Sequence, residues 1–316
     1  MTSLVEWTLD DPRRFRDEIV RFNHRIADSG LFSDEALAEL LDDYPRDNVT
    51  ICTMQPNPAP DVRWIAGEAK DVSGKDLMTA VRAGALWVSP RNVMSRHPRY
   101  RPLFDAMMSD FCRDAGTTAL KADAAILISA PKMGIFFHVD PAETMLWHVR
   151  GHKTIYIYPP KQDIVTEQAL EAILLKETLS DLPYRAEMEA QAIAIELEPG
   201  EAVSWPIHSP HRVVNGDDLN VSVSIEFSTT RSMLTNGVFY VNGVARRQLG
   251  WSPVTRGTPA FLKPAYLAAA QVLKKLNARQ PTVERSHERQ FDVDLSAPGC
   301  IRWRPGYGPV ALKVAA

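Results

Sequence analysis

The sequence predicts a mainly β fold with flanking helices, built around a sandwich or jelly-roll barrel. Between Ala122 and Phe227, short runs rich in β-branched and aromatic residues are separated by Gly, Pro, Asn or Asp. Before Ala122 and near the C-terminus, apolar residues instead recur at helical spacings. Several short strands in succession are typical of sandwiches and barrels, so we expect the helices to flank a β core.

The first expected element is an amphipathic helix. Pro12 stands where a first helical turn tolerates proline. Apolar residues then recur at spacings of four, three and four, at Phe15, Ile19, Phe22 and Ile26. The pattern predicts one helix that ends at Gly30.

A second helix is expected from Ser33, which can cap it, to the residue before Pro45. Its buried face contains Leu37, Leu40 and Leu41. The next expected elements are strands at Val49–Met54 and Ala85–Ser89 and a helix from about Tyr100 to Arg113.

The expected strands of the barrel contain the runs AILISA, IFFHVD, TMLWHV, TIYIY, AIAIEL, EAVSWP, HRVV and LNVSVSIEF. A helix-like pattern between Asp163 and Glu177 interrupts them, and the chain reads as irregular after Phe227. Ala260–Leu276 then predicts an amphipathic helix. We therefore expect an α/β flanking region at 1–121, a barrel core at 122–230 and a C-terminal helical extension at 231–316. Because exposed apolar faces tend to be covered, this extension is a candidate homodimer contact.

Composition excludes several classes of partner. The 316 residues carry 36 basic and 39 acidic side chains for a net charge of -3, with both signs well mixed. This balance favours neither nucleic acid nor an anionic membrane surface. The three cysteines are far apart, and the sequence has neither a signal peptide pattern nor an apolar run long enough for a membrane span. We expect a cytoplasmic protein.

Four residues carry the predicted chemistry. His138 and Asp140 are two positions apart in an extended segment, so both side chains point the same way and can bind one metal ion. His211 supplies a second imidazole. Two histidines and one carboxylate are the facial ligand set of non-haem Fe(II) oxygenases, which leaves coordination positions open. Lys153, 15 positions after His138, is a candidate cation for an acidic co-substrate.

Several alternatives remain open at this stage. His208 competes with His211 for the third ligand position, although a β-type run follows directly after His211. Glu143 is an alternative to Asp140, and Arg150 is an alternative to Lys153. His148 and His152 are each expected to be a surface residue or to support the site indirectly. The neighbouring cluster Met145, Leu146 and Trp147 is expected in the core.

Three segments carry a family resemblance: FHVD, WHVRGHKTIYIYPP and EPGEAVSWPIHSPHRVVN. They resemble the JmjC-type, cupin-like Fe(II)/2-oxoglutarate oxygenases, and most closely the branch that contains the factor-inhibiting-HIF asparaginyl hydroxylase. In that branch a Gly-x-Lys element precedes a strand that ends in Pro-Pro, as Gly151 and Lys153 precede Pro159 and Pro160 here. The resemblance covers about a third of the chain and implies a double-stranded β-helix, the jelly-roll core of cupins.

The resemblance implies that His138, Asp140 and His211 bind Fe(II) and that Lys153 pairs with the distal carboxylate of the co-substrate 2-oxoglutarate. Thr144 takes the place of an asparagine in the co-substrate pocket. Such an enzyme hydroxylates a peptide or protein side chain, or an amino-acid-like substrate, and releases succinate and CO2. The alternatives are a cupin-type metalloenzyme that does not use 2-oxoglutarate and a catalytically silent binding module.

The chain departs from the asparaginyl hydroxylase at other positions. Ile135 stands where that enzyme has a threonine, and Glu226 stands where it has a second asparagine. The substrate-facing part of the site has no readable match. Asparagine is therefore not supported as the target.

Overall fold

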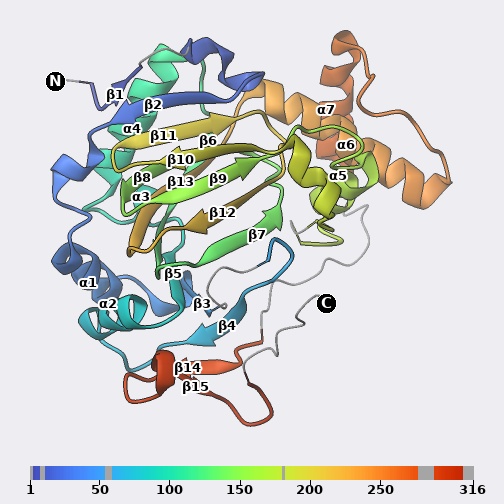
Figure 1. The fold of residues 1–316 in the computed structure, drawn as a ribbon. Helices are drawn as coiled ribbons and strands as arrows, with labels where there is room; N and C mark the ends of the chain where they lie inside the picture. The colour runs from blue at the N-terminus through green and yellow to red at the C-terminus, as the bar shows by residue number, and fades with distance from the viewer. Residues whose placement is uncertain (1–2, 8–10, 54–58, 180–181, 277–287, 309–316) are drawn as a thin grey trace.

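Two β-sheets pack face to face in the computed structural model, which describes residues 3–7, 11–53, 59–179, 182–276 and 288–308 (Figure 1). The larger sheet contains, in spatial order, β1 (Val5–Glu6), β2 (Val20–His24), β11 (Glu201–Trp205), β8 (Glu143–Arg150), β13 (Asn220–Ser228), β6 (Lys121–Ser129), β5 (Leu86–Pro90), β3 (Val49–Thr53), β4 (Ile65–Glu68), β14 (Phe291–Val293) and β15 (Ile301–Trp303). The smaller sheet contains β10 (Ile193–Leu197), β9 (Lys153–Ile157), β12 (His211–Asn215) and β7 (Gly134–His138). The predicted mainly β, jelly-roll fold with flanking helices is confirmed.

Helices flank this core on more than one side (Figure 1). The α-helices are α1 (Asp34–Asp43), α2 (Gly74–Ala83), α3 (Val93–Arg96), α4 (Arg101–Asp114), α5 (Glu167–Leu174), α6 (Thr230–Leu249) and α7 (Lys263–Lys275). Short 3-10 turns occur at η1 (Pro12–Arg16), η2 (Ile26–Ser29), η3 (Arg46–Asn48), η4 (Ala186–Gln191), η5 (Ala260–Leu262) and η6 (Pro298–Cys300). In Figure 1, α5, α6 and α7 gather at one end of the sheets, whereas α1 and α2 lie together near β5. No described helix is long and apolar enough to cross a membrane.

Side chains that alternate along β8 contribute to two apolar cores, one on each face of the larger sheet. Met145 and Trp147 point to the core shared with α1, α2 and α4, whereas Leu146 points between the two sheets. Side chains of a strand alternate between its faces, so a run that is apolar on both sides is buried on both sides. The prediction that Met145, Leu146 and Trp147 are core residues is confirmed, and Leu146 also borders the cavity described below.

The predicted helix from Pro12 to Gly30 is wrong. The segment forms η1, then β2, then η2. Val20, Phe22 and His24 are buried while Arg21 and Asn23 are exposed, which is the period of a strand, and β2 pairs with both β1 and β11. Apolar residues at 15, 19, 22 and 26 have a helical spacing by coincidence. The strand conformation of β2 is stabilised by its backbone pairing with β11.

The region expected to be irregular after Phe227 also differs, because α6 begins there. Thr229 caps it in a box with Ser232, where each side chain accepts the backbone N–H of the other. The eight predicted barrel runs correspond to β6 to β13, and the remaining predicted elements correspond to α1, β3, β5, α4, α5 and the η5–α7 segment. Met54, the last residue of the predicted Val49–Met54 strand, lies outside the described residues.

The three predicted regions share one sheet. Strands β1 to β5, which precede residue 121, join β6, β8, β11 and β13. The C-terminal region adds β14 and β15 as well as α7, so it is not only helical. The boundaries at 121 and 230 stay a prediction.

Candidate metal centre

His138 and His211 lie side by side on adjacent strands of the smaller sheet. His138 ends β7, His211 begins β12, and the two are register partners with ring centroids 4.2 Å apart. Asp140 follows β7, with Oδ2 3.4 Å from His211 Nε2 and Oδ1 4.0 Å from His138 Nε2. One ligand atom from each of the three residues lies within 4.8 Å of the others. The structure therefore brings the predicted triad together.

An irregularity between β7 and β12 aims His138. His211 pairs with His138, but Val213, two residues on, pairs with Ile135, three residues back. The extra residue on β7 is a β-bulge, a feature that re-aims side chains next to functional sites. Without it, Ile135 and His138 would point to opposite faces; with it, both line the same cavity.

Both imidazoles present the same nitrogen to the centre. His138 Nδ1 donates to the Phe136 carbonyl oxygen at 2.8 Å, and His211 Nδ1 donates to the Ser209 carbonyl oxygen at 3.2 Å. A carbonyl only accepts, so Nδ1 carries the proton and Nε2 keeps its lone pair. Burial lowers the pKa of His211 to about 4, which keeps this ring neutral at physiological pH.

The donor set fits a divalent transition metal ion. Metal–ligand distances of about 2.0–2.2 Å place neighbouring donors about 3 Å apart, so the observed separations need only a small closure around an ion. Two imidazoles and one carboxylate on one side match the facial triad. Within the described residues, no other group of histidines, cysteines and acids has this arrangement.

The triad lies in a cavity of about 650 Å³ that opens between the two sheets. Charged residues in its lining include Arg63, Arg91, Asp123 and Glu226. Its apolar lining includes Trp87, Leu127, Ile135, Leu146, Ile155, Trp205 and Val213. Such walls exclude water and strengthen electrostatic contacts inside.

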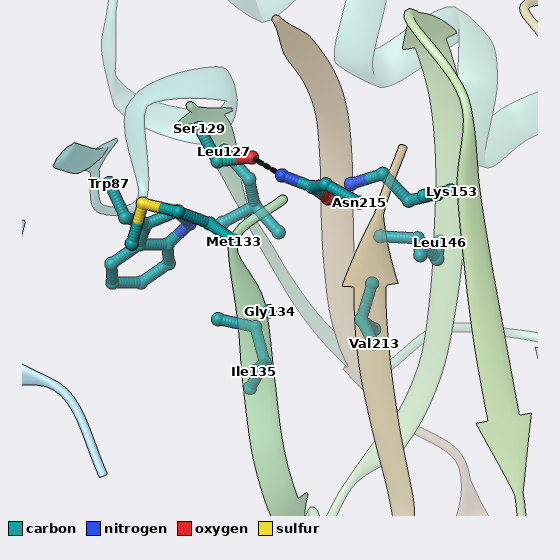
Figure 2. A pocket seen from close by; sticks show the side chains of 10 residues that line it. All are labelled: Trp87, Leu127, Ser129, Met133, Gly134, Ile135, Leu146, Lys153, Val213 and Asn215. Atoms are coloured by element: carbon teal, nitrogen blue, oxygen red, sulfur yellow. Dashed lines mark hydrogen bonds between the residues drawn. The ribbon is translucent and has the colours of Figure 1, made fainter. Parts of the chain in front are cut away.

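Lys153 lies next to this cavity. It lines a second pocket of about 20 Å³, room for one water, which shares Trp87, Leu127, Ile135, Leu146 and Val213 with the large cavity. In Figure 2, Lys153 from β9 and Asn215 from β12 reach toward the same space. The Asn215 amide donates to Ser129 Oγ at 2.7 Å and to the Ala130 carbonyl oxygen at 3.0 Å.

The charge of Lys153 has no acidic counterpart among the described residues. Its side chain is buried, and burial alone lowers its pKa to about 7. Lys153 pairs with Asn215 and His211 with Ile157, so the lysine and the triad lie four residues apart on one face, or about 13 Å along the strands.

Thr144 is buried beside the triad. Its Oγ1 lies 3.3 Å from Asp140 Oδ2 and 3.3 Å from the Ala142 carbonyl oxygen. The hydroxyl can therefore donate to the Asp140 carboxylate and orient it. Ile135 and Glu226, two further departures from the asparaginyl hydroxylase, both line the large cavity.

The alternative ligands lie elsewhere. His208 is buried, and its Nε2 is 2.8 Å from Asn236 Oδ1. Glu143 accepts from Thr229 N at 2.9 Å and from Thr229 Oγ1 at 2.7 Å, so it caps α6. Neither belongs to the cluster of donor atoms.

The remaining basic candidates also have other partners. His148 is buried between Ser222 Oγ at 3.0 Å and the Gly151 carbonyl oxygen at 2.8 Å. His152 is exposed between Glu198 and Asp218, at 3.0 Å from each. Arg150 is paired with Asp34 at 2.8 Å and does not line the cavity.

Sequence reasoning missed an aromatic wall beside His138. Trp64 and Trp87 have ring centroids 4.7 Å apart, and Phe136 lies 6.1 Å from Trp64 and 5.7 Å from His138. Trp87 belongs to β5, which precedes the motif region but pairs with β6. The sequence carries no signal for that pairing.

A family profile described as a cupin-like domain matches residues 35–233. The chain belongs to this cupin-like family. The match begins within α1 and ends within α6, so it includes the whole smaller sheet and all strands of the larger sheet except β1, β2, β14 and β15. A search of curated protein sequences found no match to this cupin-like chain.

Solved structures with a similar fold include the X-ray structure of Escherichia coli YcfD, at 18% sequence identity and a TM-score of 0.49, over 90% of this chain and 70% of that chain. They also include YcfD, described as a ribosomal oxygenase, in complex with cobalt and 2-oxoglutarate, at 19% identity and a TM-score of 0.47, over 91% of this chain and 74% of that chain. A complex of YcfD with cobalt and succinic acid matches with the same values. At this identity the likeness concerns the fold alone.

Proposed function

We propose that this cupin-like chain is an Fe(II)- and 2-oxoglutarate-dependent oxygenase. The observation that carries the proposal is that two unlike groups line two adjacent pockets with a shared wall. His138, Asp140 and His211 line the large cavity, and the buried cation Lys153 lines the small pocket that shares five residues with it. A cupin that binds a metal for another purpose has no need for a buried cation, which is costly without an anionic partner.

The residues divide the chemistry as follows. His138, Asp140 and His211 would hold Fe(II), which supplies the redox chemistry that couples decarboxylation of the keto acid to C–H hydroxylation. Lys153 would bind the distal carboxylate of 2-oxoglutarate as a compact charge on a flexible stem. Thr144 would keep Asp140 oriented through its hydroxyl.

The cavity also supports the substrate class. Its volume of about 650 Å³ is within the range of small-molecule sites, about 300–1,000 Å³. We infer that it takes the keto acid together with a peptide or protein side chain, or an amino-acid-like molecule. The Gly151–Lys153 element and Pro159-Pro160 support placement with JmjC-type oxygenases, in the branch of the factor-inhibiting-HIF hydroxylase.

The direct test is succinate formation from 2-oxoglutarate by the Fe(II)-loaded chain, alone and with pools of candidate peptides. We expect turnover in the wild type that one pool increases, and no turnover in Asp140→Ala. Calorimetry with Mn(II) in place of Fe(II) separates the alternatives. Metal binding without 2-oxoglutarate binding would identify a different cupin metalloenzyme, and binding of neither would identify a silent module.

We also propose that the chain forms a homodimer through a C-terminal apolar surface, defined as Leu249, Trp251, Val254, Phe261, Val272 and Leu276. All six side chains are exposed, with Phe261 at 80% and Leu249 at 77%. Large exposed apolar side chains that form a common patch are typical of protein–protein contacts, and we infer that these six form one. A second copy is the simplest partner for a surface that every copy carries.

A further inference from the structure

Asn236 joins the two loops that carry the candidate ligands. Its Nδ2 donates to the Pro141 carbonyl oxygen at 2.7 Å, and Pro141 directly follows Asp140. Its Oδ1 lies 2.8 Å from His208 Nε2, and His208 precedes His211 by three residues. A carboxamide oxygen accepts, so the His208 ring donates. One side chain on α6 therefore touches both ligand-bearing loops.

Both loops lie outside the regular strands. Asp140 to Ala142 and Pro206 to Pro210 lie between strands, outside the ladders that fix β7 and β12. His208 also has a positive φ of 65°, a conformation that non-glycine residues rarely adopt and that surrounding contacts must hold. Its ring packs edge-on against Phe239 of α6, with centroids 5.1 Å apart.

Helix α6 is itself fixed to the barrel. Glu143 at the start of β8 binds both the backbone N–H and the hydroxyl of Thr229, the cap of α6. Asn236 follows two turns later, so its amide is held at a set position relative to the barrel. Helix α6 can therefore hold the two ligand-bearing loops in place.

We propose that Asn236 is a positioning residue that sets the spacing between Asp140 and His211, and that His208 acts through Asn236 rather than on the metal. The proposal rests on the proposed function only in assuming that the triad binds a metal ion. Loss of Asn236 leaves the Pro141 carbonyl and the His208 N–H without their partner. The two loops then relax independently, and the ligand atoms move apart.

The test uses Co(II), whose visible absorption reports its coordination geometry and whose affinity is measured by competition with a chelator. Asn236→Ala should weaken Co(II) binding about tenfold or more, in the range seen for groups that orient metal ligands, and should change the visible bands. His208→Asn keeps the backbone conformation accessible and should have a similar effect. The double variant should be no weaker than the stronger single, because both changes break one connection.

Asn242→Ala is the matched control. Asn242 lies on the same helix, is fully buried and donates to Thr255 Oγ1 at 3.0 Å, away from both loops. It should lower the unfolding temperature yet leave the Co(II) affinity and spectrum as in the wild type. If Asn236→Ala does not fold, Asn236→Asp provides the same test, because it keeps the acceptor for His208 and loses the donor to Pro141.

Three outcomes would overturn the inference. The first is a wild-type Co(II) affinity and spectrum in Asn236→Ala. The second is an equal loss in Asn242→Ala, which would mean that the effect is general destabilisation. The third is that His208→Asn abolishes binding as completely as His211→Ala, which would make His208 a ligand. Failure of the wild type itself to bind Co(II) would instead overturn the proposed function, and the inference with it.

Discussion

Lys153 is the residue whose physical state depends most on what binds beside it. Burial lowers its pKa to about 7, because the charged form loses hydration and gains no described acidic partner. A bound carboxylate would favour the ammonium form and raise this pKa again. Binding of an acidic co-substrate is thereby linked to proton uptake between pH 7 and the raised pKa of the bound form.

The sign of the linkage gives a prediction. Below pH 7 the free lysine is already charged, so the affinity for 2-oxoglutarate should be flat with pH. Above pH 7 the free lysine loses its proton, so the apparent Kd should rise with pH, approaching about tenfold per unit. Calorimetry at saturating Mn(II) without oxygen, between pH 6.5 and 8.5, measures this slope.

Lys153→Met should weaken 2-oxoglutarate binding and abolish its dependence on pH above 7. Losing a charge-assisted contact costs about 1.5–3 kcal/mol, which is a weakening of about ten- to hundredfold. Lys132→Met is the control, since Lys132 is an exposed lysine paired with Asp217 at 3.3 Å. Unchanged 2-oxoglutarate binding in Lys153→Met would move the anchor to Arg63 or Arg91, which line the cavity.

At the scale of elements, the sequence predicted those features that depend on interactions between residues close together in the chain. Ser33 caps α1 by accepting from the Ala36 N–H, as its residue type indicates. The two-residue spacing of His138 and Asp140 indicated a shared metal, because the motif lies at the end of one strand. Even there, the bulge that turns Ile135 and His138 to one side came only from pairing with β12.

Elements whose conformation depends on distant partners were not predictable in the same way. Val20, Phe22 and His24 form a strand because β11, almost 180 residues later, offers an edge. Helix α6 buries Gly237, Asn242 and Gly243 against different neighbours, so it has no simple apolar stripe to detect. The partners of Lys153 in its pocket, Trp87 and Asn215, come from strands whose pairing is likewise a tertiary property.

The contact between α1 and α2 gives a prediction at this scale. Gly74 is the first residue of α2, and a Cβ added there would lie 2.0 Å from the Ala38 carbonyl oxygen of α1. That neighbour is backbone, so relief requires the two helices to separate. Gly74→Ala should therefore destabilise the fold by about 1–3 kcal/mol, even though alanine favours helices.

Urea unfolding measures the change in free energy. Gly257→Ala is the matched control, because a Cβ there meets only Val254 Cγ1 at an ordinary 3.8 Å. It should stay within about 0.5 kcal/mol of the wild type. Equal stability of Gly74→Ala and Gly257→Ala would contradict the close helix contact.

At the scale of the whole molecule, the C-terminal region adds the last two strands, β14 and β15, to the larger sheet, beside β4 from the N-terminal region. Strand β14 pairs in parallel with β4, and Phe291 packs directly on Gly67. Arg304 reinforces this contact through Asp292 and Glu68, at 2.6 Å from each. Deleting everything after α6 would therefore disrupt the larger sheet as well as any contact made by α7.

The homodimer is better tested by point changes on the C-terminal apolar surface. Phe261 and Val272 are exposed and lie on η5 and α7, so an acidic residue at each position should leave the chain folded. At a dimer interface, however, the same carboxylates would be desolvated without partners and would repel their symmetry copies. Phe261→Asp/Val272→Asp should shift the mass in light scattering from twice the chain mass of 35.3 kDa to that mass itself.

Leu120→Asp, an exposed apolar position outside this surface, should remain dimeric. A wild type that is monomeric at every concentration tested, or a double variant that stays dimeric, would show that this surface does not join two copies.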